Sequence, residues 1–118
     1  MNEKAFEQKV KVFLKDKGCW VLKTWSNGIQ REGVPDLLVC CNGFFIGIEL
    51  KAENGHPSDL QLWNVDQIRN AGGIAIVLYP NHFEAFRRMI EDLISDDFGH
   101  EDWYWIQKDL FDERRKEE

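Results

Sequence analysis

The sequence predicts a single α/β domain, in which a central mixed sheet is flanked by helices in the order αβββαβα. Three observations support this fold class. The chain has 118 residues, a length typical of one compact domain. Two apolar segments that resemble strands are joined by Asn42-Gly43, a strong hairpin signal. Segments with helical features precede and follow this hairpin, which is typical of a sheet packed against helices.

The first predicted helix spans about residues 2–17. Its apolar residues recur at the spacing of one helix face, at positions Phe6, Val10, Phe13 and Leu14. Gly18 follows directly and is typical of a helix C-terminus. A strand is then expected over 19–25 and a polar, glycine-containing loop over 26–33.

The rest of the domain is expected to contain a hairpin, a helix, a buried strand and a last helix. Ser58 and Asn81 are suitable N-caps for the two helices. The predicted strands and helices span residues 35–41, 44–51, 58–70, 74–79 and 81–94. The domain core is thus expected over residues 3–94.

Residues 95–118 form an acidic extension with an aromatic segment, 103–111, that reads WYWIQKDLF. This segment is expected either to pack back on the domain or to form a subunit contact. The aromatic residues considered for that contact are Trp103, Tyr104, Trp105 and Phe111.

The charge distribution leaves nucleic acid open as a partner. A net charge of −6 argues mildly against it. Residues 1–31 nevertheless hold seven Lys/Arg and three Asp/Glu, whereas residues 90–118 hold four and eleven. The N-terminal part could therefore face an anion that the tail would repel. A solvated face with an acidic tail explains the same distribution.

Other sequence features favour an intracellular protein. No run of about 18 apolar residues predicts a transmembrane helix. The charged N-terminus lacks the apolar segment of a signal peptide. Cys19, Cys40 and Cys41 lack zinc-type spacing and are expected to be buried thiols.

The hairpin register places three charged residues together. A two-residue loop pairs Cys41 with Phe44, and the same register sets Asp36 opposite Glu49. Opposed side chains point to the same side of the sheet, with Cβ atoms about 4.5–5.5 Å apart. Lys51 lies two residues beyond Glu49 and shares that face. A three-residue loop would shift the register and place the two carboxylates on opposite faces.

Two opposed carboxylates destabilise a hairpin unless something compensates their charge. A divalent cation such as Mg²⁺ would compensate it, because carboxylate oxygens are ligands that Mg²⁺ prefers. A metal-bound water is more acidic, and Lys51 beside it could orient or deprotonate that water. These parts fit hydrolysis of a phosphodiester. The competing interpretation is an ion-paired hairpin end without catalysis.

The motifs "GVPD" (33–36) and "IELK" (48–51) resemble those of the PD-(D/E)xK nuclease superfamily. More narrowly, the chain is similar to the phage-type VRR-NUC domains over about residues 3–94. Other residues that match this family in order are the segment "FEQKV" (6–10), Gly18, Lys23 and Gln61. The resemblance implies a restriction-endonuclease-like fold and a phage or prophage protein in the cytoplasm of a bacterial host.

The resemblance also implies a Mg²⁺ site in which Mn²⁺ would substitute. The implied metal ligands are Asp36, Glu49, the backbone carbonyl of Leu50, and Glu7. Glu7 lies at the edge of the apolar stripe of its helix and can look toward the sheet, with Glu3 as the rival. Lys51 matches the catalytic lysine. Gln61 matches the glutamine that orients site groups or water, although a plain surface position explains it too.

The function implied is a Mg²⁺-dependent deoxyribonuclease acting on branched DNA, similar to Holliday-junction resolvases and paired as a homodimer. Phosphate contacts of this kind carry no sequence code, so a preference for DNA structure is expected. The residues considered for these contacts are Lys9, Lys15, Lys23 and Arg31. The alternatives are a general nicking nuclease, a non-catalytic nucleic-acid-binding module and a pure interaction protein.

Overall fold

The computed structural model describes residues 1–25, 32–95 and 107 of the chain. Its elements are α1 (Glu3–Asp16), β1 (Trp20–Lys23), β2 (Leu37–Cys41), β3 (Phe44–Leu50), α2 (Asp59–Asn70), β4 (Ile74–Leu78), the 3-10 turn η1 (Pro80–His82) and α3 (Phe83–Ile94). The predicted order αβββαβα is confirmed. No helix in these ranges is both long enough and apolar enough to cross a membrane.

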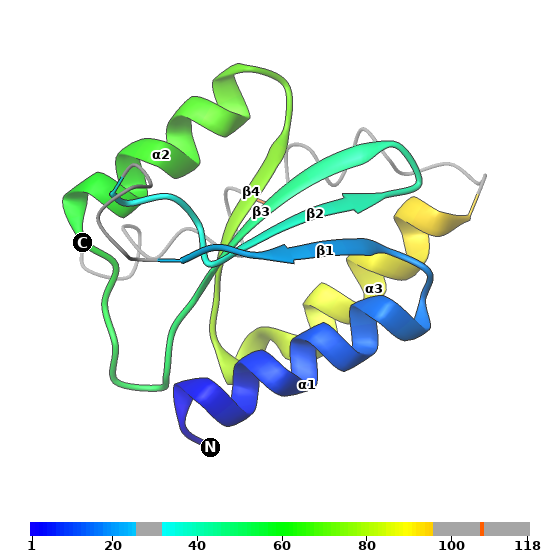
Figure 1. The fold of residues 1–118 in the computed structure, drawn as a ribbon, viewed down its shortest axis with the longest axis horizontal. Helices are drawn as coiled ribbons and strands as arrows, with labels where there is room; N and C mark the ends of the chain where they lie inside the picture. The colour runs from blue at the N-terminus through cyan, green and yellow to red at the C-terminus, as the bar shows by residue number, and fades with distance from the viewer. Residues whose placement is uncertain (26–31, 96–106, 108–118) are drawn as a thin grey trace.

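The four strands form one mixed sheet in the order β1-β2-β3-β4. β2 runs antiparallel to both β1 and β3, whereas β3 and β4 are parallel. The parallel pair requires a crossover, which α2 provides on one face of the sheet. α1 and α3 cover the opposite face (Figure 1). The predicted mixed sheet flanked by helices is therefore confirmed.

The main core lies between the sheet and the helix pair α1 and α3. Phe6, Val10 and Leu14 of α1 are fully buried there, as their helical spacing predicts. The ring of Phe13 contacts Phe83 and Phe86 of α3 edge-on, at centroid distances of 5.6 and 5.9 Å. Aromatic contacts of this geometry add stability beyond the burial of their area.

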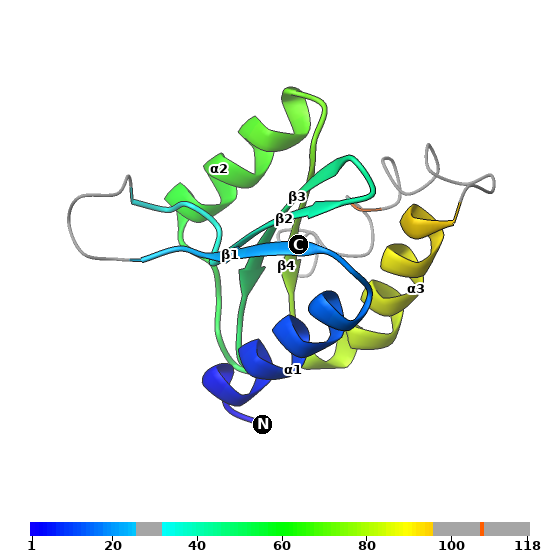
Figure 2. The same cartoon turned by 45° about the vertical axis from the view of Figure 1, so that its right-hand side comes forward.

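The opposite face of the sheet is only partly covered, because α2 packs over its β4 side (Figure 2). Val65 of α2 forms a small buried cluster with Ala75, Val77 and Tyr79. β1 lies at the other edge of the sheet, and its Trp20 and Leu22 side chains are 60% and 45% exposed. Among the described residues, no element therefore covers the apolar surface of β1 on this face.

The hairpin has the two-residue turn that its sequence predicts. Asn42 and Gly43 have φ angles of 51° and 87°, the positive values that a type I′ turn requires. Cys41 pairs with Phe44, and the register continues to Leu37 opposite Ile48. The register that opposes Asp36 and Glu49 is thus correct, and the slipped alternative is wrong.

Two local expectations are wrong. Asn81 does not cap α3: it lies inside η1, and α3 begins at Phe83 without a side-chain cap. Cys40 is exposed, whereas Cys19 and Cys41 are buried. Strand alternation explains this difference, because Cys40 is opposite Trp20 on the uncovered face.

Most of the aromatic segment 103–111 lies outside the described residues, including Trp103, Tyr104, Trp105 and Phe111. Gln107 is described and is fully buried. Its Oε1 accepts a 2.8 Å hydrogen bond from the backbone N–H of Ala75, and its backbone carbonyl accepts one from Arg69. This residue of the extension therefore contacts β4 and α2.

Candidate active site

Asp36 and Glu49 lie together where β2 begins and β3 ends. Asp36 directly precedes β2, and Glu49 is the second-to-last residue of β3. Leu37 and Ile48 form the pair of β2 and β3 that lies farthest from the turn. The next residues, Asp36 and Glu49, point to the same side, and their carboxyl groups share a hydrogen bond.

The backbone around Asp36 is held by both neighbouring strands. Its Oδ2 accepts a 2.8 Å hydrogen bond from the backbone N–H of Leu50. Its carbonyl accepts one of 2.9 Å from the backbone N–H of Thr24, directly after β1. The Thr24 hydroxyl also donates to the carbonyl of Pro35 over 2.9 Å. These bonds fix the backbone of Asp36 and one oxygen of its carboxylate beside Glu49.

Glu49 is a buried acid, with only 1% of the residue exposed. Burial raises its pKa to about 9, and the hydrogen bond and negative charge of Asp36 raise it as well. Lys51 lowers this pKa, and Glu3 raises it slightly. This raised pKa favours the protonated form of Glu49 at neutral pH when no cation is bound.

The second oxygen of Glu49, Oε2, is buried and has no hydrogen-bond partner within the described part of the chain. A buried acceptor without a partner is costly, so such an atom suggests a missing ligand. A divalent cation fits here, because it would replace the proton between Asp36 and Glu49 and satisfy this oxygen.

The described ranges contain no group of three or more His, Cys, Asp or Glu side chains that could hold a metal ion. Side chains alone therefore do not complete the coordination of a cation at Asp36 and Glu49. The backbone carbonyl of Leu50, water or a substrate phosphate would have to supply the remaining oxygens. Mg²⁺ is commonly bound in this way, through one or two carboxylates.

A hollow of about 550 Å³ opens beside Asp36 between α1 and the end of β1. Its lining residues are Glu3, Lys4, Glu7, Lys11, Lys23, Trp25 and Asp36. Both candidate helix glutamates thus face the site. Glu7 forms ion pairs with Lys23 over 2.5 Å and with Lys11 over 3.6 Å. Glu3 lies close enough to Glu49 for its charge to act on that carboxyl.

Comparisons with known proteins show the family of the chain. The family model of the archaeal Holliday junction resolvases (Hjc) matches residues 2–117. The chain belongs to the Hjc family. A solved structure described as a VRR_NUC domain is similar to it, with 26% identity and a TM-score of 0.58. That similarity covers 81% of this chain and 97% of the other. The comparison with curated proteins found no match.

Family membership identifies this Hjc-family chain as a DNA endonuclease domain with a restriction-endonuclease-like fold. It also identifies the chain as a VRR-NUC nuclease domain of the PD-(D/E)xK type. The segments "GVPD" and "IELK", which contain Asp36, Glu49 and Lys51, lie within the matched residues 2–117.

Lys51 and Gln61 have different surroundings in this Hjc-family domain. The backbone N–H of Lys51 donates to the carbonyl of Leu78 over 3.1 Å, which fixes the end of β3 against β4. The charge of Lys51 acts directly on Glu49. Gln61 instead forms a capping box, in which its Oε1 accepts a 2.8 Å hydrogen bond from the N–H of Ser58. Gln61 thus has a structural role at the start of α2.

The predicted DNA-contacting cations are dispersed. Lys23 lines the hollow but is paired with Glu7. Lys9 lies over the ring of Phe83, 4.4 Å from its centroid, on the side of α1 that faces α3. Lys15 lies in the last turn of α1, and Arg31 is outside the described residues.

Sequence reasoning missed Lys4 and Lys11, which line the hollow. A sequence signal for both existed, because they lie three residues before and four residues after Glu7, on the same helix face.

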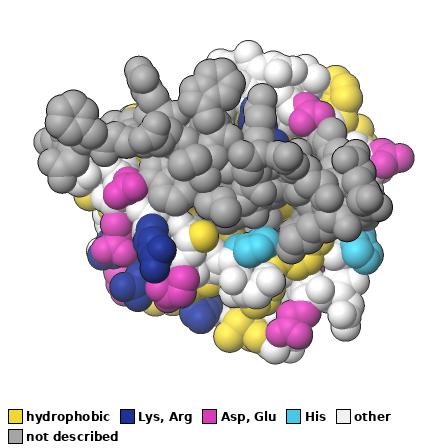
Figure 3. All heavy atoms as spheres, turned by 180° about the vertical axis from the view of Figure 1, so that it is seen from behind, with side chains coloured by type: hydrophobic (Ala, Val, Ile, Leu, Met, Phe, Trp, Pro, Cys, Tyr) yellow, Lys and Arg dark blue, Asp and Glu magenta, His cyan; other side chains and the backbone are white. Residues whose placement is uncertain are grey.

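On the rear of the molecule, the visible Lys/Arg and Asp/Glu side chains lie among one another (Figure 3). Ion pairs such as Lys17–Glu91 and Arg87–Glu91 bring opposite charges together.

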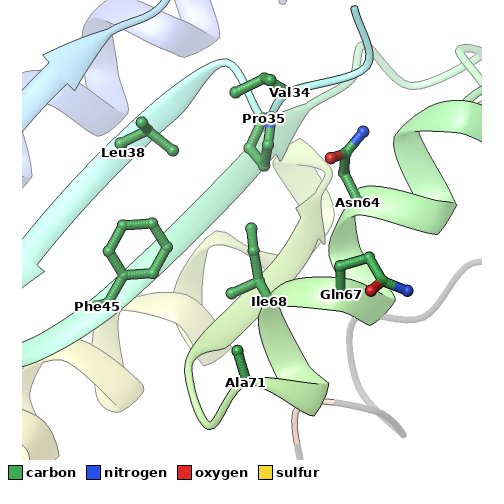
Figure 4. Close-up of a pocket in the computed structure, with 8 residues that line it drawn as sticks. All are labelled: Val34, Pro35, Leu38, Phe45, Asn64, Gln67, Ile68 and Ala71. Atoms are coloured by element: carbon green, nitrogen blue, oxygen red, sulfur yellow. The ribbon is translucent and has the colours of Figure 1, made fainter. Parts of the chain in front are cut away.

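A second hollow, of about 330 Å³, lies between α2 and the uncovered part of the sheet (Figure 4). It is mostly apolar, and its lining residues are Val34, Pro35, Leu38, Phe45, Asn64, Gln67, Ile68 and Ala71. The Phe45 side chain is 46% exposed at this hollow. Leu22 pairs with Leu38 across the strands, so the hollow continues into the exposed apolar surface of β1.

Proposed function

We propose that this Hjc-family domain is a metal-dependent endonuclease that hydrolyses phosphodiester bonds in branched DNA. The proposed ion is Mg²⁺, with Mn²⁺ as a substitute. The pair of half-buried Asp36 and buried Glu49 carries this proposal, because Glu49 keeps a carboxyl oxygen that no described residue satisfies. A cation at this point would compensate both carboxylates and face the hollow that Asp36 lines.

Each residue of the site has a proposed role. The side chains of Asp36 and Glu49 and the backbone carbonyl of Leu50 hold the cation directly. Because the described side chains do not form a group of three metal ligands, Glu7, or its rival Glu3, would take part through a bound water. When bound, a divalent cation polarises the phosphate and makes its bound water more acidic. Lys51 orients the attacking water or takes its proton. Gln61 orients site groups in addition to capping α2.

The DNA strand is proposed to approach over α1. Lys4, Lys11 and Lys23 line the hollow and would contact phosphates there, with Lys9, Lys15 and Arg31 extending the path of the backbone. Contacts to phosphates position the duplex and carry no sequence code. A preference for branched structure over sequence therefore follows.

We further propose that the domain acts as a homodimer. Its uncovered sheet face exposes Trp20, Leu22 and Phe45 by 60%, 45% and 46% beside an apolar hollow. A standard interface buries about 800 Å² on each partner, and contiguous apolar patches of several hundred Å² mark such surfaces. A two-fold axis through this surface would present two sites to two strands of a junction.

The dimer is tested by sedimentation velocity of Leu22→Lys and Phe45→Lys. Both variants should sediment as monomers at concentrations at which the wild type is a dimer. Val12→Lys is the matched control, because Val12 is 52% exposed on α1, outside the proposed surface. A wild-type monomer at all concentrations, or equal behaviour of all three variants, would contradict the dimer.

The cleavage experiment compares a labelled four-way junction with the linear duplex of the same sequence, in Mg²⁺ and in Mn²⁺. EDTA and Lys51→Ala serve as controls. Paired, metal-dependent cuts in the junction alone are the expected result. Cutting of both substrates would favour a general nicking nuclease. A folded protein that binds DNA but cuts neither substrate would favour a non-catalytic binding module.

A further inference from the structure

Trp25 is an exposed aromatic residue beside the proposed site, and the proposed chemistry gives it no role. Its side chain is 69% exposed, the largest value among the big apolar side chains of the described residues. It lines the same hollow as Asp36 and belongs to neither buried apolar cluster. Most of the Trp25 surface is therefore accessible to a ligand in the hollow.

The position of Trp25 relative to the site is fixed through the preceding residue. The N–H of Thr24 donates to the carbonyl of Asp36, and the Thr24 hydroxyl donates to the carbonyl of Pro35, both over 2.9 Å. The backbone that enters Trp25 is therefore attached to the residue that carries the site carboxylate. The indole belongs to the same local framework as Asp36.

Trp25 is separate from the exposed apolar surface of β1. Trp20 and Leu22 point to the uncovered face of the sheet, and strand alternation places Lys23 on the other face. Lys23 and Trp25 then line the hollow beside α1 together. The surroundings of Trp25 are thus charged groups of the site rather than the apolar side chains proposed for the subunit contact.

The lining of the hollow combines three kinds of groups. Lys4, Lys11 and Lys23 stand beside the carboxylates of Glu3, Glu7 and Asp36, and Trp25 supplies a flat aromatic surface. Because Lys11 and Lys23 pair with Glu7, a phosphate would be held mainly by Lys4 and by the proposed cation at Asp36. Its volume of about 550 Å³ falls within the range of about 300–1,000 Å³ typical of ligand sites. A molecule that joins an anionic phosphate to a planar ring, such as a nucleotide within a strand, matches this set.

We propose that Trp25 stacks on the base of a nucleotide next to the scissile phosphate. This inference rests on the proposed function and names the feature of DNA that the site selects. In a continuous duplex each base is stacked between its neighbours and cannot meet the indole. At a branch point an unstacked base is available. Stacking on an aromatic side chain tolerates every base, so this contact would select structure without selecting sequence.

The test measures binding by fluorescence anisotropy in EDTA, so that no cleavage occurs. The probes are a labelled four-way junction, the same junction with abasic nucleotides flanking the branch, and the matching linear duplex. The proteins are the wild type, Trp25→Ala, Trp25→Phe and the control Trp63→Ala. Trp63 is a half-exposed tryptophan of α2 that does not line the hollow.

Trp25→Ala should weaken junction binding by about 5- to 150-fold, the range expected from loss of one stacked base. Trp25→Phe should restore most of this affinity, and Trp63→Ala should change little. Neither the duplex nor the abasic junction should distinguish Trp25→Ala from the wild type, because neither presents a base to the indole. This set of results would support the proposal.

Three results would overturn it. Trp25→Ala could bind the junction as tightly as the wild type. It could lose the same affinity for the junction, the duplex and the abasic junction, which would indicate a general surface contact. It could instead sediment as a monomer while the wild type is a dimer, which would indicate a subunit contact.

The outcome is separable from that of the proposed function. A wild type that cuts the junction, with binding unaffected by Trp25→Ala, would leave the nuclease intact and overturn the stacking contact. A wild type that cuts no substrate, with binding to unstacked bases that depends on Trp25, would remove the nuclease and support the stacking contact.

Discussion

The backbone N–H of Leu50 donates a 2.8 Å hydrogen bond to Oδ2 of Asp36. This bond ties the carboxylate at the start of β2 to the end of β3, next to Glu49. The same side chain is thus part of the fold and part of the proposed cation site. Substitutions at Asp36 can separate the two roles, because an amide keeps the acceptor oxygen and removes the charge.

Asp36→Asn should retain the folded structure and lose metal binding, whereas Asp36→Ala should lose both metal binding and stability. The alanine variant leaves the N–H of Leu50 without its acceptor, which should lower the free energy of unfolding by about 1–3 kcal/mol. Urea denaturation measures the stability, and calorimetry with Mn²⁺ measures the binding. Wild-type metal affinity in Asp36→Asn would contradict the proposed site.

Glu49 should make the metal-free protein less stable as pH rises. Its pKa is about 9 in the folded state against an ordinary value of 4.5. Between these values the native state keeps a proton that the unfolded state has lost. The free energy of unfolding should therefore fall with increasing pH in this window, by at most about 1.4 kcal/mol per pH unit.

Glu49→Gln should remove this dependence, since an amide does not titrate. Between pH 5 and 8 the difference in free energy of unfolding between Glu49→Gln and the wild type should grow in favour of the variant. The growth should be at most about 1.4 kcal/mol per pH unit. Urea denaturation in EDTA at several pH values gives the comparison. Parallel pH profiles for the two proteins would show that Glu49 is ionised in the native state.

Lys51→Ala should leave the fold and the cation site in place and lower the rate of cleavage by at least about 100-fold. The expected loss reflects removal of a positioned group that holds the attacking water or takes its proton. Single-turnover cleavage of the junction measures the rate, and calorimetry confirms metal binding. Full activity in this variant would remove the lysine from the mechanism.

Glu7→Gln and Glu3→Gln should distinguish the two candidate helix ligands. We expect Glu7→Gln to weaken Mn²⁺ binding by about tenfold or more and Glu3→Gln to change it much less. The ion pairs with Lys23 and Lys11 hold the Glu7 carboxylate beside the site. The reverse order of affinities would identify Glu3 as the ligand.

Gln61→Glu and Gln61→Ala should separate the capping role of Gln61 from its role in the site. Glutamate can replace glutamine in a capping box, so only the alanine variant should lose stability, by about 0.5–2 kcal/mol. Both variants should cut the junction at least about tenfold more slowly if the amide orients site groups. Wild-type cleavage by Gln61→Glu would restrict Gln61 to the cap.

Local sequence signals predicted most of the fold because their causes are local. The positive φ angles of Asn42 and Gly43 specify a two-residue turn, and the turn specifies the register of β2 and β3. The helical spacing of Phe6, Val10 and Leu14 likewise predicts which face of α1 is buried. Asn81 shows the limit, because η1 replaced the expected cap.

The sequence by itself determined that Asp36, Glu49 and Lys51 come together, because strand alternation and one tight turn suffice to place them. Tertiary structure decided which residues surround them. The packing of α1 against the sheet brings Lys4 and Lys11 to the site, and the hydrogen bonds between the end of β1 and the start of β2 bring Trp25 there. The partial cover that α2 provides leaves the apolar face of β1 exposed. These features depend on contacts between elements distant in the chain, which no local spacing encodes.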